Sequence, residues 1–183
     1  VIRMRADEGR IRLVEQRSSG FFGDFGDPVL PLSPVEESLF GTQLGRFMQN
    51  VTTTPHFPRS AALAREMWRV RTGREVDGVA AVDPVALQGL LEASGPVRLP
   101  TGRRINGQNA ARLLLNQVYL DLEDPAAQDA FFAASAAAIF EKVMSGGGDL
   151  PATTTAMAEA AERGRLLLWS ARPKEQAVIS GTT

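Results

Sequence analysis

Cysteine is absent from the 183 residues, which excludes disulfide bonds, thiol nucleophiles and any zinc site that uses cysteine. Histidine occurs once, as His56, so a metal site built on two histidines of this chain is excluded as well. Lysine is nearly absent: of the 20 basic residues only Lys142 and Lys174 are lysines, and the others are arginines. The formal net charge of −1 provides no overall positive field that would recruit nucleic acid.

Long hydrophobic runs are also missing. The longest strongly apolar stretch covers residues 130–140, which is shorter than the about 20 residues needed to cross a membrane. No signal peptide is recognisable. The chain begins at Val1 inside a predicted strand, so we expect it to be a fragment of a longer protein.

The hydrophobic pattern and the turn residues predict short strands that alternate with helices. The predicted strands cover residues 1–4, 10–15, 77–82, 97–99, 103–105 and 165–170. The predicted helices begin near residues 34, 58, 84, 107, 125 and 150, several of them with a capping residue followed by proline. Two hairpins, turning at residues 6–9 and 100–102, interrupt the alternation. We therefore predict one α/β domain over residues 1–183, with a mixed β-sheet flanked by helices.

Three boundaries in this prediction depend on particular residues. Asn106 is predicted to cap a continuous helix over residues 107–118, and the glycines at 146–148 are predicted to end the long alanine-rich helix. Residues 20–34 are predicted to be irregular chain that Phe21, Phe22 and Phe25 hold in place.

The common catalytic and nucleotide-binding motifs are missing. There is no G-x-x-x-x-G-K-[ST] loop, no G-x-G-x-x-G after a strand and no G-x-S-x-G elbow. A cytoplasmic nucleotide-binding protein is therefore the weakest of our hypotheses. A serine triad that uses His56 and a pair of hydrolytic carboxylates both stay open, because each depends on three-dimensional distances.

The segment from Arg46 to Arg59 is the strongest candidate for a binding site. It brings Arg46, Asn50, His56 and Arg59 close to a predicted helix start, where free N–H groups and the helix dipole favour anions. These four residues are predicted to hold a phosphate group; the alternative is that the threonines of this segment and His56 bond to the local backbone.

Arg17 and two aspartates complete the candidate set. Arg17 follows the second strand and is predicted to reach toward the same anion. Asp7 and Asp24 are the candidate metal ligands, because Mg²⁺ prefers oxygen ligands; alternatively Asp7 forms a turn and Asp24 solvates a loop.

Several motifs resemble a domain family of unknown function from the cell envelope of high-GC Gram-positive bacteria. They are Phe57-Pro58-x-Ser60-Ala61, Val76-Asp77-Gly78-Val79-Ala80-Ala81-Val82-Asp83-Pro84, Gly95-Pro96-Val97, Asp124 to Phe132 and Gly164 to Ser170. The resemblance implies a membrane anchor outside this fragment and an extracytoplasmic location.

The region from Asp77 to Val97 is more distantly similar to the LytR-CpsA-Psr family. That resemblance implies a LytR-CpsA-Psr-like fold with one or more N-terminal strands before Val1. It also implies a phosphotransferase that moves a glycopolymer from a polyprenyl-pyrophosphate carrier to the cell wall. In that family arginines hold the pyrophosphate and aspartates hold Mg²⁺.

Two hypotheses follow. In the first, the chain binds or transfers a polyprenyl-pyrophosphate-linked glycopolymer, with Arg17, Arg46 and Arg59 around the phosphates. In the second, it is a non-catalytic binding or scaffold module at the cell surface.

Overall fold

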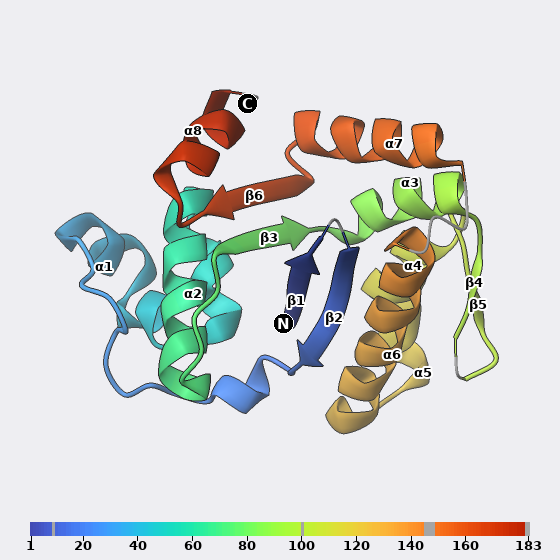
Figure 1. Ribbon diagram of the computed structural model, residues 1–183. Helices are drawn as coiled ribbons and strands as arrows, with labels where there is room; N and C mark the ends of the chain where they lie inside the picture. Colours follow the sequence, from blue (N-terminus) through green and yellow to red (C-terminus); the bar gives the residue numbers. More distant parts are fainter. Residues whose placement is uncertain (9, 100, 145–148, 182–183) are drawn as a thin grey trace. The chain divides into compact units, whose positions relative to one another are not determined.

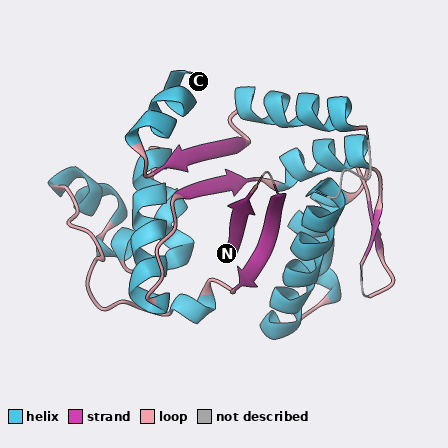
Figure 2. Cartoon of the chain, in the orientation of Figure 1, coloured by secondary structure: helices cyan, strands magenta, loops and turns pink. Residues whose placement is uncertain are grey.

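The computed structural model describes residues 1–8, 10–99, 101–144 and 149–181 (Figure 1). Its strands are β1 (Ile2–Asp7), β2 (Arg10–Gln16), β3 (Gly78–Val82), β4 (Val97–Arg98), β5 (Arg104–Ile105) and β6 (Leu166–Ser170). Its α-helices are α1 (Pro34–Phe40), α2 (Phe57–Thr72), α3 (Pro84–Ser94), α4 (Ala110–Arg112), α5 (Val118–Asp121), α6 (Pro125–Met144), α7 (Leu150–Glu162) and α8 (Pro173–Gly181). Helices and short strands alternate along most of the chain (Figure 2). The predicted α/β class is confirmed.

The strands of the described residues form three separate two-stranded sheets. Two of them, β1–β2 and β4–β5, are antiparallel hairpins, as predicted. The third pairs β3 with β6, whose arrows run in opposite directions in Figure 1. The β-structure is thus divided into small ladders in place of one mixed sheet.

Two compact units can be distinguished along the chain. The first contains Val1–Arg17 and Val82–Leu166, and the second contains Ser18–Ala81 and Leu167–Thr183. Each unit has its own hydrophobic core and is described by itself below. A single domain over residues 1–183 stays a prediction.

The core of the first unit is built around α3, α6 and the β4–β5 hairpin. Its buried side chains are Leu91, Val97, Leu99, Ile105, Ala110, Leu113, Leu114, Val118, Phe131 and Ile139. Asp83 caps α3 by accepting a hydrogen bond from the Ala86 N–H at 2.7 Å, and Pro84 follows it, as predicted. The cap fixes the start of α3 at Pro84, and Leu91 of this helix is buried in the core.

The core of the second unit forms between α2 and the chain that precedes it. It contains Phe22, Leu44, Met48, Val51, Leu63, Met67 and Trp68. Phe22 is fully buried and holds residues 20–34 in place, as predicted, whereas Phe21 is 42% exposed. The loop before α2 includes the 3-10 turns η2 (Thr42–Gly45) and η3 (Met48–Thr53).

The helix predicted over residues 107–118 differs from the observed one. The Asn106 side chain accepts hydrogen bonds from the Gln108 and Asn109 N–H groups, which stabilises a local turn and delays the helix to Ala110. The chain then passes through a π-helical turn, η4 (Leu113–Gln117), before α5 begins. The predicted end of α6 at residues 146–148 lies outside the described residues.

A membrane-spanning helix would need greater length and apolarity than any helix among the described residues has.

Candidate functional site

Arg46 is held by a carboxylate of its own unit. Its guanidinium group donates from Nε to Asp24 Oδ1 at 3.0 Å, and its Nη2 donates to Asp24 Oδ2. The Gly26 N–H donates to the same carboxylate. These hydrogen bonds, above all those from Arg46, lower the pKa of Asp24. The pair ties two loop segments of the second unit together.

Arg59, in the first turn of α2, is held in a similar way by Glu36 in α1. Its Nε donates to Glu36 Oε1 at 2.7 Å, and its Nη2 donates to Glu36 Oε2 at 3.2 Å and to the Pro31 carbonyl at 2.7 Å. Glu36 also accepts from the Ser33 N–H, and Ser33 Oγ accepts from the Glu36 N–H, which completes a capping box. The bonds from Arg59 and from the Ser33 N–H lower the pKa of Glu36.

Asn50 and His56 lie between these two arginines in the sequence. The Asn50 Nδ2 donates to the Gln43 carbonyl at 3.4 Å, and the Thr53 hydroxyl donates to the Asn50 carbonyl. His56 is the exposed N-cap residue of α2, where its side chain makes no capping hydrogen bond. The Thr53 contact follows the alternative that the threonines bond to the local backbone, and Asn50, which that alternative did not include, does the same.

Arg17 belongs to the first unit and ends the β1–β2 hairpin. Its Nε and Nη2 donate to Glu15 Oε1 at 3.1 and 2.8 Å. The Glu15 carboxylate also lies 3.4 Å from Arg3 Nε. Arg17 lies in one unit and Arg46 and Arg59 in the other, so their convergence on one anion stays a prediction.

The two predicted metal ligands differ in their surroundings. Asp24 is engaged by Arg46, whereas Asp7 is strongly exposed at the end of β1, 4.0 Å from Arg5 Nη2. Across residues 1–8, 10–99, 101–144 and 149–181, no three histidine or carboxylate side chains are grouped so that they could hold a metal ion. Asp7 and Asp24 as metal ligands therefore stay a prediction.

An apolar groove of about 400 Å³ lies between β2 and α6 of the first unit. Its lining residues are Ile11, Arg12, Leu13, Ala137, Phe140, Glu141 and Met144. Across the hairpin, Met4 pairs with Leu13 and Ala6 with Ile11, so four apolar side chains share the face of the hairpin that carries the groove.

Arg12, at the border of this groove, lies opposite Arg5 in the hairpin register. Because side chains alternate along a strand, this pair belongs to the face of the hairpin opposite that of Ile11 and Leu13. Arg12 forms no ion pair within the described part of the chain, although Glu141 also lines the groove. The one contact of Arg5 with a carboxylate, at 4.0 Å from Asp7, joins two side chains that are each 72% exposed.

A family comparison covers the residues of this hairpin. The sequence profile of DUF4012, described as a protein of unknown function, matches residues 1–119, which is more than half of the chain. The chain belongs to the DUF4012 family. No curated protein and no solved structure matches it.

The DUF4012 match contains the opposed arginines of the hairpin and also the three arginines predicted to hold a phosphate. Arg5 and Arg12 lie inside residues 1–119, as do Arg17, Arg46 and Arg59, whereas the α6 side of the groove lies beyond the match. The groove was not predicted from the sequence, because the segments that form its two walls are more than a hundred residues apart. The available signal was the apolar i, i+3 and i+7 spacing of Ala137, Phe140 and Met144 in α6.

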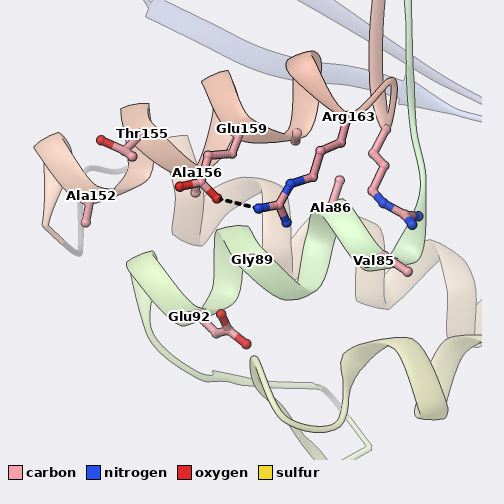
Figure 3. A pocket seen from close by; sticks show the side chains of 11 residues that line it. Val85, Ala86, Gly89, Glu92, Ala152, Thr155, Ala156, Glu159 and Arg163 are labelled. Carbon is pink, nitrogen blue, oxygen red and sulfur yellow. Dashed lines mark ion pairs between the residues drawn. The ribbon is translucent and has the colours of Figure 1, made fainter.

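A second groove, of about 300 Å³, runs between α3 and α7 in the same unit (Figure 3). Small residues such as Ala86, Gly89 and Ala156 line this groove. An ion pair between Glu159 and Arg163, at 3.5 Å, lies along the α7 wall. Of these two grooves, the one between β2 and α6 has Arg12 at its border, and the one between α3 and α7 is lined mainly by small residues and by the ion pair of Glu159 and Arg163.

Proposed function

We propose that this DUF4012 chain is an extracytoplasmic domain of the cell envelope that binds a polyprenyl-phosphate-linked glycopolymer without transferring it. The observation that carries the proposal is the apolar β2–α6 groove with Arg12 at its border and Arg5 opposite Arg12. Such a site matches an amphiphile that has a long apolar chain and an anionic head group. The extracytoplasmic location and the membrane anchor are proposed from the family resemblance described above.

The apolar wall accounts for the lipid part. Ile11, Phe140 and Met144 present apolar surface to the groove, and Ile11 and Met144 are 40% and 38% exposed. Each Å² of such surface that a polyprenyl chain removes from water contributes roughly 25 cal/mol. Isoprenoid units have no polar atoms that would be left unsatisfied in this groove.

The arginines account for the head group. A guanidinium group is a planar fork of donors that matches phosphate oxygens in pairs. Arg5 and Arg12 repel each other across the ladder, and a phosphate that lies between them would replace this repulsion with attraction.

We propose binding ahead of transfer because the other candidate arginines are engaged by carboxylates. A LytR-CpsA-Psr-type transferase would need arginines free to hold the pyrophosphate and carboxylates free to hold Mg²⁺. Here Arg17, Arg46 and Arg59 are each engaged by a carboxylate, and the oxygen ligands do not group around a cation site. We derive no catalytic step from this geometry.

The test is a titration of the chain with undecaprenyl phosphate, undecaprenol and inorganic phosphate, each in the same detergent, read by native mass spectrometry. Binding should be strongest for undecaprenyl phosphate. The Ala137→Leu variant fills the groove and should weaken binding about tenfold, whereas the control Ala130→Leu adds the same side chain to an exposed position of α6 outside the groove. Arg12→Gln should weaken binding of the phosphate but leave undecaprenol unchanged.

Two results would contradict the proposal. If the Ala137→Leu and Ala130→Leu variants bound undecaprenyl phosphate equally well, the groove would not be the lipid site. Transfer of glycopolymer to peptidoglycan by the purified chain would show that the chain is an enzyme. A scaffold module is the second candidate, favoured by the small-residue groove between α3 and α7. Co-sedimentation with purified cell-wall sacculi, together with no lipid binding, would select that candidate.

A further inference from the structure

We propose that Arg98 and Arg104 form a second anion site, on the β4–β5 hairpin, that takes the phosphate groups of a phosphate-bearing chain. The two residues are direct partners in the antiparallel register of β4 and β5. Both side chains are exposed. Directly opposed residues in such a ladder have Cβ atoms about 5 Å apart, so the two guanidinium groups can reach one ligand together.

The inner side of the hairpin fixes where these arginines point. Val97 and Ile105, the neighbouring pair of the register, are 8% and 0% exposed and belong to the core of the first unit. Because successive side chains of a strand alternate between its two faces, burial of this pair directs Arg98 and Arg104 away from the core. Both cations are therefore held on one outward face by a rigid, buried anchor.

The charges of this pair are uncompensated. Within the described ranges, neither guanidinium group forms an ion pair or a hydrogen bond with another residue. Arg103, the neighbouring arginine, differs in this respect, because its Nη2 donates to Asp121 Oδ2 at 2.7 Å. Asp121 thus neutralises Arg103, whereas no carboxylate of the described ranges pairs with Arg98 or Arg104.

Two opposed cations with no counter-charge destabilise a ladder that is only two residue pairs long. An anion between them reverses the sign of this interaction. A tetrahedral phosphate presents its oxygens in several directions and carries up to two negative charges, so it can accept from two guanidinium forks at once and balance both charges, whereas a carboxylate carries one charge. Phosphate is therefore the ligand group that the pair fits best.

The phosphate could come from a soluble phosphate chain or from a lipid head group, and the two sources are distinguished by the probes. Inorganic tripolyphosphate represents the first, and vesicles of phosphatidylglycerol in phosphatidylcholine represent the second. The site shares no residue with the β2–α6 groove, so its test is independent of the function proposed above.

Binding of both probes is measured with the whole chain and with three variants. Arg98→Gln combined with Arg104→Gln should weaken binding at least tenfold and reduce the dependence of binding on salt. The control combines Arg112→Gln with Lys174→Gln, which removes the same net charge from two exposed positions outside the hairpin, and should stay within twofold of the original chain. Arg104→Glu should abolish binding while the protein stays folded, because it places opposite charges across the ladder.

Circular dichroism of each variant separates a loss of binding from a loss of folding. Binding of tripolyphosphate or of the vesicles that is lost only in the hairpin variants supports the site and names its source. The proposal is overturned if neither probe binds, or if the charge-matched control loses as much affinity as the hairpin variant.

Discussion

Replacing Arg59 with alanine tests whether this arginine ties the second unit together or is available to a phosphate. In the structure its guanidinium group makes three hydrogen bonds, two to Glu36 and one to the Pro31 carbonyl. The Arg59 and Glu36 side chains are only 21% and 18% exposed, so solvent screens this ion pair less than a surface pair. Loss of the arginine also leaves the half-buried Glu36 charge with one fewer partner.

The expected magnitude lies between two limits. A fully exposed ion pair contributes about 0.2–1 kcal/mol, and a hydrogen bond to a charged group contributes about 1.5–3 kcal/mol. For a bidentate pair that is mostly shielded from solvent, we expect Arg59→Ala to lower the free energy of unfolding by about 2 kcal/mol. The double variant with Glu36→Gln should lose less than the sum of the single changes, because the two residues interact directly.

Tryptophan fluorescence during urea unfolding is the appropriate assay, because both tryptophans, Trp68 and Trp169, belong to the second unit. Arg69→Ala is the matched control. Arg69 lies on the same helix and contacts Glu66 in the same bidentate way, but it is 46% exposed and bonds only within one helical turn. We expect that variant to lose clearly less stability than Arg59→Ala, because pairs within one exposed helical turn contribute little.

The structural role of Arg59 would be refuted by a loss as small as that of Arg69→Ala. It would also be refuted if added phosphate, at constant ionic strength, stabilised the original chain but not the Arg59→Ala variant. That result would return Arg59 to the predicted phosphate site.

Three further predictions concern packing and pH. Gly78→Ala should destabilise the β3–β6 sheet by about 1–3 kcal/mol, measured by tryptophan fluorescence, because the new Cβ would lie 2.8 Å from the Trp169 carbonyl oxygen. Leu91→Ala should cost about 2–5 kcal/mol, measured by circular dichroism in urea, because Leu91 is 1% exposed in the core of the first unit. The second unit should lose stability when the pH is lowered below about 4, because folding lowers the pKa of Asp24 and Glu36. Groups of this kind stabilise the fold above their unfolded pKa and lose that contribution as the pH falls through the folded pKa, so a transition midpoint unchanged between pH 6 and pH 3 would contradict the prediction.

The parts of the fold that depend on local signals were predictable. The Ser33 capping box, the Asp83 cap and the left-handed Gly73 at the end of α2 each depend on residues within four positions of one another. Both hairpins follow from short apolar runs around turn residues. The π-helical turn at Leu113–Gln117 carries no such local signal, so a continuous helix was predicted in its place.

The parts that depend on distant contacts were not predictable in the same way. The pairing of β3 with β6 joins strands that are separated by five α-helices and a hairpin. The carboxylate partners of Arg46 and Arg59 lie 22 and 23 residues away, Asp24 in a loop and Glu36 in the short helix α1, so no local periodicity links them to the arginines. The opposed Arg98 and Arg104 stand three residues before and after position 101, the centre of the predicted turn, so this pair could have been recognised from the sequence.

The division of the arginines into paired and opposed sets decides where an anion can bind this chain. An anion at Arg46 or Arg59 must first displace a bidentate carboxylate, which lowers the affinity of that arginine for the anion. An anion at Arg5 and Arg12, or at Arg98 and Arg104, displaces no bidentate carboxylate and relieves the repulsion between two opposed cations. Arginines that face a carboxylate therefore join segments of the fold, and the anion sites proposed above lie where an arginine faces another arginine.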